Sequence, residues 1–462
     1  MDFKKYMDEQ ENSLVEDIFT VCRVNSERTE PLDGAPYGAG PRKALETAKE
    51  IAEKSGFSAE IRGDRVLVAE LGEGEAALGM LAHLDVVPAG TGWTKCEPYS
   101  PVREGDMLYG RGVADDKGPA IAALYAMKAV RESGVKLTKK VQLLLGSCEE
   151  TGSDDIDWYL AHYKMPPKVF TPDGDFPVVN VEKGRAAFLI SCPASEEKSR
   201  HVRRMQGGHV ANAVAGEASC GIVGVTLDEV NAAIAALSTP GVSFDARVCE
   251  YGNVHISAHG VAAHASLPQD GKNALQALLK LIDALKLDDT VGNRALTALA
   301  RALPYGDYSG KAFGADCADA SGALTVNLGT LQYSVWDGLK ATLDCRVPVC
   351  SSAEEIDKKL TEFIGGDATV ELKGKAAPHE VPSDSDFVRG LLDIYNSYTG
   401  ENGESIAIGG GTYVHDIEGG VAFGATFPGR TPKMHEPDEN TPVSDLKLAA
   451  AIFAETIIKF CK

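Results

Sequence analysis

An apolar segment that ends in a histidine and an aspartate constrains the fold of this chain more than any other feature. Residues Ala76–Met80 are all apolar or glycine, and such a run predicts a buried β-strand. His83 and Asp85 follow this run, and side chains two positions apart on a strand lie on the same face. His83 could then bind a metal ion while Asp85 fixes the orientation of its ring. Taken alone, the pair favours the simpler interpretation of a structural histidine at a strand end.

Two later clusters of carboxylates strengthen the metal hypothesis. One lies in the glycine-rich turn Gly110–Pro119, and the other follows a second apolar run, Val141–Leu145. The carboxyl ends of strands in an α/β sheet meet at one edge, where such sheets bind ligands. Solvated acidic loops are the alternative, but they do not explain why the acids follow apolar strands. The clusters supply four carboxylates: Asp115, Asp116, Glu149 and Glu150.

The order of expected elements predicts an α/β fold with an insertion. Strands alternate with helices up to about residue 184 and again after 378, which favours a mostly parallel sheet. Between them, short alternating segments indicate an α+β unit with one strong helix. We therefore expect one domain whose two parts are 1–184 and 378–462, with a second domain inserted at 185–377. The expected helices include 3–28, 42–55, 120–133, 273–285, 386–399 and 444–460, the last with a cap formed by Ser444 and Asp445.

Composition limits the function and the compartment. The net charge of −21 excludes a surface that attracts nucleic acid. Ten cysteines occur without a CxxC pair, which indicates reduced thiols in a cytoplasmic protein. The amino-terminal residues have no apolar signal segment, and no apolar run reaches about 18 residues. We therefore expect a soluble protein that contacts neither nucleic acid nor membrane.

The clusters belong to five motifs that follow one another along nearly the whole chain. They are His83–Pro88, Tyr109–Pro119, Ser147–Asp155, Thr171–Gly174, and Phe427–Arg430 leading to Met434–Glu436. This set resembles the dinuclear-zinc metallopeptidase family of carnosinase, aminoacylase and glutamate carboxypeptidase, and within it the bacterial PepV-type dipeptidases most. The resemblance implies a mixed-sheet zinc-peptidase catalytic domain with an inserted lid that is ferredoxin-like and enlarged.

The resemblance also implies two divalent metal ions, zinc in the first place, with manganese or cobalt as substitutes. The implied ligands are His83, Asp115 and Asp173 for one ion, and Asp115, Glu150 and His435 for the other. Asp115 would bridge the ions, with a cis peptide bond to the next residue. Asp116 is the competing candidate for the bridge.

The general base implied by the resemblance is Glu149, which would activate a water that bridges the metals. Adjacent residues in an extended segment point in opposite directions, so only one of Glu149 and Glu150 need bind a metal. Asp85 would support His83.

The inserted unit and the segment after it supply the remaining candidates. His264 resembles a lid histidine that stabilises an oxyanion, and Arg346 resembles an arginine that binds the carboxyl terminus of the substrate. Asn212 would assist Arg346. Three residues are expected near the substrate backbone: Gly410, Gly411 and Thr412. Related dipeptidases tend to carry Tyr-Gly-Arg or Tyr-Ala-Arg next, whereas this chain has Tyr413-Val414-His415, so the side-chain preference stays open.

The predicted function is hydrolysis of short peptides with a free carboxyl terminus by a dinuclear metal-dependent dipeptidase. An N-acyl amino-acid deacylase would use the same metals and base, and a catalytically silent peptide-binding module is the third interpretation. The inserted segment, 185–377, exceeds the ~100–150 residues common for one domain. The PepV-type dipeptidases resemble it in having an enlarged lid that imitates a second subunit's lid, so we expect a monomer. A dimer with a decorated lid is the alternative.

Overall fold

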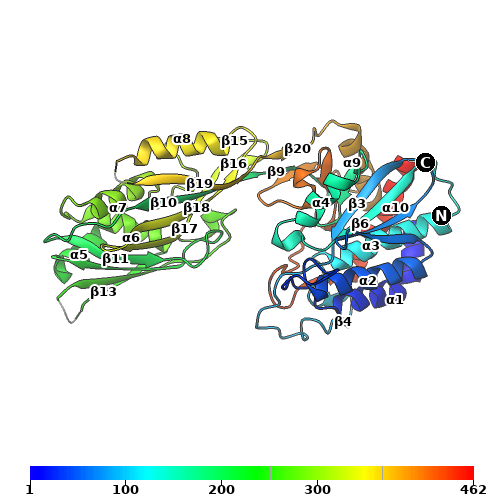
Figure 1. The fold of residues 1–462 in the computed structure, drawn as a ribbon, viewed down its shortest axis with the longest axis horizontal. Coiled ribbons are helices and arrows are strands. Elements are labelled where there is room, and N and C mark those ends of the chain that lie inside the picture. Colours follow the sequence, from blue (N-terminus) through cyan, green and yellow to red (C-terminus); the bar gives the residue numbers. More distant parts are fainter. Residues whose placement is uncertain (250–251, 367) are drawn as a thin grey trace. The chain divides into compact units, whose positions relative to one another are not determined.

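The computed structural model describes residues 1–249, 252–366 and 368–462. The chain forms two compact units (Figure 1). The first unit comprises Met1–Val181, Glu380–Ile406 and Gly411–Lys462, and the second comprises Glu182–His379 and Ala407–Gly410. Residues 250, 251 and 367, which belong to the predicted insertion, lie outside the described residues. The domain boundaries predicted at residues 184 and 377 stay a prediction.

A mixed sheet forms the centre of the first unit. Strand β3 pairs in parallel with β6 and β7, whereas β2 pairs antiparallel with β6. The strand order is β1 (Ser58–Arg62), β2 (Val66–Leu71), β6 (Lys140–Gly146), β3 (Ala76–His83), β7 (Val169–Thr171), β22 (Gly420–Ala422), β9 (Val178–Glu182) and β20 (His379–Glu380), with β21 (Ser405–Ile408) also on β9. The expected strand before His83 is therefore present, with parallel neighbours on both sides.

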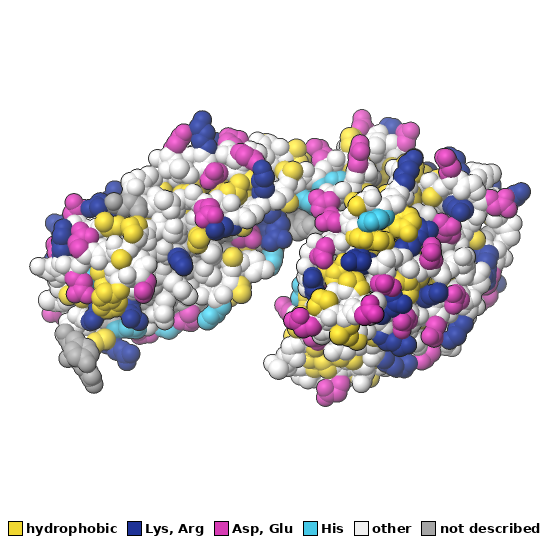
Figure 2. Space-filling model, viewed as in Figure 1, with side chains coloured by type: hydrophobic (Ala, Val, Ile, Leu, Met, Phe, Trp, Pro, Cys, Tyr) yellow, Lys and Arg dark blue, Asp and Glu magenta, His cyan; other side chains and the backbone are white. Residues whose placement is uncertain are grey.

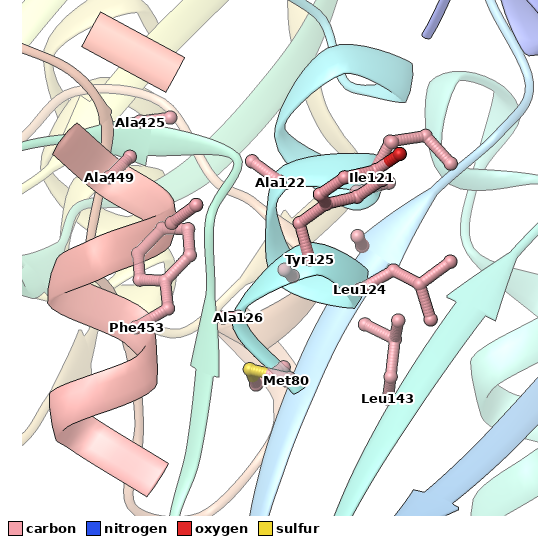
Figure 3. Close-up of a cluster of buried hydrophobic side chains, with 14 of the residues drawn as sticks. Met80, Ile121, Ala122, Leu124, Tyr125, Ala126, Leu143, Ala425, Ala449 and Phe453 are labelled. Atoms are coloured by element: carbon pink, nitrogen blue, oxygen red, sulfur yellow. The ribbon is translucent and has the colours of Figure 1, made fainter. Parts of the chain in front are cut away.

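Apolar side chains cover both faces of this sheet, because alternate residues of each strand point to opposite sides. Figure 3 shows Leu124 of α3 beside Met80 and Leu143 from the strands, with Phe453 of α10 in the same cluster. On the other face, strand residues such as Leu81 pack against α4 and the short 3-10 helix η3. The helices of this unit are α1 (Phe3–Cys22), α2 (Ala39–Lys54), α3 (Lys117–Glu132), α4 (Asp154–His162), α9 (Asp386–Thr399) and α10 (Val443–Cys461), and η3 spans Tyr413–Asp416.

Small sheets complete the first unit and connect its loops. Strands β4 (Val102–Glu104), β5 (Met107–Tyr109) and β24 (Asn440–Pro442) form one of them, and β8 (Gly174–Asp175) pairs with β23 (Ala425–Thr426) in another. The β5–β24 pair joins segments that lie more than 300 positions apart in the chain, since Asn440 lies opposite Tyr109. This pair holds together two of the loops in which the sequence places metal ligands.

The second unit is built on one antiparallel sheet. Its apolar side chains alternate along the strands and form a separate core with four helices. The strand order is β13 (Ser243–Val248), β14 (Val254–His259), β12 (Glu217–Val223), β11 (His201–Gly207), β17 (Thr325–Ser334), β18 (Gly338–Val347), β10 (Gly184–Cys192) and β19 (Thr369–Ala376). The helices are α5 (Leu227–Ala236), α6 (Ala274–Ala284), α7 (Val291–Ala302) and α8 (Ala353–Ile364), and β15 (Ala318–Asp319) and β16 (Gly322–Ala323) form a hairpin. A mixed-sheet α/β domain with a separate antiparallel-sheet domain confirms the predicted fold class.

Several local expectations were wrong. The first helix ends at Cys22 rather than at residue 28. The last helix starts at Val443, one residue before the predicted cap, and the Asp106 carboxylate accepts both the backbone N–H and the hydroxyl of Ser444. The insertion contains four helices in its described part rather than one strong helix.

The surface carries both signs of charge despite the acidic composition. On the face drawn in Figure 2, acidic and basic side chains are interspersed over both units, and the chain has 67 acidic against 46 basic residues. None of the described helices combines the length and the apolarity that crossing a membrane requires.

Candidate metal centre

Three neighbouring strands of the mixed sheet end in candidate metal ligands. His83 is the last residue of β3, Asp173 lies two positions after β7, and Glu149 and Glu150 begin three positions after β6. Because β6, β3 and β7 are adjacent and parallel, their carboxyl ends meet at one edge. The sequence-predicted ligands of the first unit are therefore brought together, as the contacts below show.

Asp115 lies between the two histidines. Its Oδ1 is 3.0 Å from Nε2 of His83, and its Oδ2 is 2.9 Å from Nε2 of His435. His435 Nε2 also lies 3.2 Å from Oε1 of Glu150, and His83 Nε2 lies 3.6 Å from Oδ2 of Asp173. These contacts form two sets of three residues that share Asp115.

The donor atoms suit a pair of divalent ions. The ligand atoms of His83, Glu149 and Asp173 lie within 4.8 Å of one another, and so do those of His83, Asp115 and Glu150. This grouping puts Glu149 beside the first ion, whereas the shorter contacts put Asp115 there. The Asp115 contacts, at 3.0 and 2.9 Å, have the spacing of two ligands on one ion. Imidazole nitrogen and carboxylate oxygen are the ligands that zinc, manganese and cobalt accept.

Crowding of acids in a buried site favours bound cations. Burial raises the pKa of Glu149 well above its ordinary value, and the carboxylates of Asp173, Glu150 and Asp115 raise it further. Hydrogen bonds with Asp115 and Glu150 raise the pKa of His435 to about 10. Since each of these carboxylates disfavours the ionisation of the next, a positive ion among them would stabilise the whole cluster.

The second aspartate of the pair has a different partner. Oδ2 of Asp116 accepts a hydrogen bond from the backbone N–H of His83 at 3.0 Å, and its side chain is buried. The peptide bond between Asp115 and Asp116 is cis. The geometry thus favours Asp115 over Asp116 as the carboxylate between two ions.

The two glutamates do not lie in an extended segment, so that expectation was wrong. Glu149–Thr151 is a 3-10 helix, η1. The Asp85 carboxylate accepts the backbone N–H groups of Glu149 and Glu150, both at 3.1 Å. A carboxylate at the start of such a turn pairs with N–H groups that otherwise have no partner. Both glutamate side chains consequently reach the cluster.

Asp85 supports His83 mainly through its backbone. Nδ1 of His83 lies 3.0 Å from the Asp85 carbonyl oxygen and 3.5 Å from the Asp85 carboxylate. Burial lowers the pKa of His83, but hydrogen bonds with Asp115, Asp173 and Asp85 raise it above the ordinary value. Asp85 therefore organises both the first histidine and the glutamate turn.

Two buried acids behind the site were missed by the sequence analysis. Asp155 accepts the backbone N–H of Ser147 at 2.6 Å and the hydroxyl of Tyr413 at 2.7 Å. Glu439 contacts the loop that carries Asp115. The position of Glu439, four residues after His435 in a loop expected to hold a ligand, was the only local signal.

Arg346 belongs to the second unit and is 4% exposed. Its Nε donates to Oδ1 of Asp344 at 2.8 Å, and its Nη1 donates to the Gly409 carbonyl at 3.1 Å. The guanidinium is thereby fixed on two sides. A planar guanidinium has five N–H groups, so these two bonds leave other donors for a ligand.

His264 lies in the loop after β14. Its Nδ1 is 2.7 Å from the Ser266 hydroxyl. The backbone of His264 forms an isolated β-bridge with Ala213. The backbone carbonyl of Asn212 accepts the N–H of Ala265 at 2.9 Å. The structure thus brings Asn212 to the His264 loop by a backbone contact. The structure gives no hydrogen bond between Asn212 and Arg346.

The glycine loop crosses the division between the units. Gly410 belongs to the second unit, whereas Gly411 and Thr412 belong to the first. The Thr412 hydroxyl accepts the N–H of Val414 at 3.4 Å and caps η3.

Comparisons with known proteins agree with the motifs and the fold. Residues 79–459 match the family model described as peptidase family M20/M25/M40. The chain is 34% identical over 463 residues to "Putative dipeptidase YtjP" of Bacillus subtilis (strain 168), covering 98% of both chains. It is 31% identical over 468 residues to the Beta-Ala-Xaa dipeptidase of Lactobacillus delbrueckii subsp. lactis, covering 100% of this chain and 99% of that one.

Among solved structures, human carnosine dipeptidase 1 is similar in fold, with a TM-score of 0.58 at 14% identity over 98% of both chains. The resemblance inferred from the motifs is therefore confirmed, and so is the expectation of an enzyme of the metallopeptidase type. This chain belongs to peptidase family M20/M25/M40.

Proposed function

We propose that this protein is a dinuclear metal-dependent dipeptidase that hydrolyses the peptide bond of short peptides with a free carboxyl terminus. The observation that carries the proposal is full-length similarity to proteins named as dipeptidases, combined with a compact cluster of imidazoles and carboxylates at the sheet edge. A small peptide is the expected partner.

The residues of the cluster would hold two divalent ions, with zinc as the first candidate and manganese or cobalt as substitutes. His83, Asp115 and Asp173 are the proposed ligands of one ion, and Asp115, Glu150 and His435 are those of the other. Ions bound there would polarise the scissile carbonyl and make a water molecule more acidic.

Glu149 is the proposed general base. It is not needed for either set of short contacts, yet its carboxylate lies within 4.8 Å of ligand atoms of His83 and Asp173. A carboxylate oxygen of Glu149 would take a proton from the water as the water oxygen bonds to the scissile carbonyl carbon. When the C–N bond breaks, the same oxygen would return the proton to the leaving amine.

Residues outside the cluster are proposed to bind the substrate. Arg346 would bind the carboxyl terminus, since its fixed guanidinium retains free donors in a buried position. Asn212 would assist it, and His264 would donate to the developing oxyanion. The backbone of the glycine loop would lie along the substrate through three residues: Gly410, Gly411 and Thr412.

We also propose a cytoplasmic monomer with the second unit as lid. All ten cysteines lie in the described part of the chain and none of them forms a disulfide, which supports a reducing compartment. The eight-stranded sheet of the second unit supports an enlarged lid. Such a lid would bring His264 to the metals of its own chain.

A substrate panel tests the proposal. Free dipeptides, including those with an amino-terminal β-alanine, and N-acetyl amino acids are assayed with the full chain and added zinc or manganese. We expect metal-dependent cleavage of the dipeptides. Activity on the acetylated series alone would assign the chain as an N-acyl amino-acid deacylase, and binding of dipeptides without cleavage would assign it as a silent binding module.

A further inference from the structure

One carboxylate outside the proposed ligand set connects the two loops of the metal centre. Glu439 is fully buried, at 0% exposure, and lies four residues after His435. Its Oε1 accepts the backbone N–H groups of Gly112 at 3.0 Å, Ala114 at 2.9 Å and Asp115 at 3.1 Å. Glu439 therefore connects the loop that carries His435 to the backbone of the loop that carries Asp115.

A buried ion pair completes this contact. Oε2 of Glu439 accepts a hydrogen bond from Nη1 of Arg111 at 2.7 Å. Arg111 is 1% exposed, and its guanidinium carbon lies 5.3 Å from the centroid of the Trp93 ring. Its Nε and Nη2 have no hydrogen-bond partner among the described residues. The buried Glu439 carboxylate is thus paired with a buried guanidinium.

Backbone contacts align the same two loops. The N–H of Gly110 donates to the Glu439 carbonyl at 3.1 Å, and Asn440 pairs with Tyr109 in the β5–β24 ladder. Glu439 therefore contacts the loop that carries Asp115 through its backbone carbonyl and through its carboxylate. Asp115 contacts both histidines, and a shift of the Asp115 loop would change both ligand sets together.

We propose that Glu439 is a positioning residue of the metal centre, which fixes the Asp115 loop relative to the His435 loop and thereby sets the affinity for both ions. This inference rests on the ligand assignment of the proposed function. All groups around the Glu439 carboxylate are donors, so both of its oxygens must accept. An amide at this position would place its NH₂ group against either Arg111 or the backbone N–H groups.

The test is the affinity of the full chain for zinc, measured after removal of metal by competition with a chromophoric chelator. Glu439→Gln changes one atom of the side chain and should weaken binding of both ions by roughly 10- to 100-fold. The d–d absorption of the cobalt-substituted protein should shift as well, because Asp115 would take a different position.

Asp307→Asn is the matched control. Asp307 lies in the second unit and also accepts three backbone N–H groups, those of Ser309, Lys311 and Ala312. This variant loses a similar loop contact away from the metal ligands, so its zinc affinity should stay within about twofold of that of the unmodified protein.

The outcomes separate the two claims. If the unmodified protein binds no pair of ions, the proposed function fails. If it binds two ions and Glu439→Gln binds them with the same affinity and the same cobalt spectrum, the positioning role of Glu439 is refuted. If Glu439→Gln shows no cooperative unfolding, Glu439→Asp takes its place. This variant keeps the charge but is one methylene shorter, so unchanged zinc affinity in it refutes the role and a loss for both ions supports it.

Discussion

Replacing the terminal carboxylate of a dipeptide substrate with an amide tests the proposed role of Arg346. The guanidinium of Arg346 is buried, and two of its N–H groups are engaged by Asp344 and by the Gly409 carbonyl. Removing one partner of a buried charged hydrogen bond costs about 2–5 kcal/mol. Asp344 already compensates part of the charge, so we expect the lower part of this range, about 2–3 kcal/mol. This corresponds to a loss of roughly 30- to 150-fold in kcat/KM for the amidated substrate.

The assay compares kcat/KM for free and amidated forms of one dipeptide in three proteins. In the unmodified protein, kcat/KM should be roughly 30- to 150-fold higher for the free form than for the amidated form. In Arg346→Met this preference should nearly vanish. Arg301→Met is the control, because Arg301 also lies in the second unit but its side chain is 66% exposed and pairs with Asp283. It should keep the preference. Equal cleavage of both forms by the unmodified protein would remove Arg346 from the substrate site.

Two further predictions concern the buried Asp155 and the oligomeric state. Burial raises the pKa of Asp155 to about 6, so its ionisation between about pH 4 and 6 destabilises the folded state by roughly 3 kcal/mol as the pH rises. Asp155→Asn should reduce the pH dependence of urea-derived unfolding free energies by about this amount, and an unreduced pH dependence contradicts the assignment. A mixture of His264→Ala and Glu149→Ala, each inactive alone, should stay inactive under subunit-exchange conditions if the protein is a monomer. Recovered activity, with a mass near twice 48.9 kDa by light scattering, would establish a dimer in which the lid histidines are exchanged.

The place where the candidate ligands meet could be predicted because it depends on local patterns. Apolar runs followed by His83, Glu149 and Asp173 form strands, and parallel neighbours bring their carboxyl ends to one edge. Only the adjacency of these strands had to be assumed. The helix Asp386–Thr399 was predicted with its observed bounds, since Ser385 caps it within the local sequence.

The parts that could not be predicted depend on contacts between distant residues. Glu149 and Glu150 fold into a 3-10 turn because Asp85, more than 60 residues earlier, accepts their N–H groups. Ser444 is not a cap because the helix already begins at Val443, and the distant Asp106 carboxylate accepts the backbone N–H of Ser444. In the sequence, Glu439 looks like an ordinary surface acid. Its burial and its hydrogen bonds with Gly112 and Asp115 appear only in the folded structure. No periodicity in the sequence encodes such pairings.

The central claim is that Glu149 moves the proton while Glu150 holds a metal, and metal content measured with turnover on the same samples tests it most directly. Glu149→Ala should keep two ions per chain by elemental analysis and lose roughly 10²–10⁴-fold or more in turnover. Glu150→Ala and His83→Ala should lose metal as well as activity. A Glu149→Ala protein that has lost one ion, beside a Glu150→Ala protein that keeps both, would contradict the account.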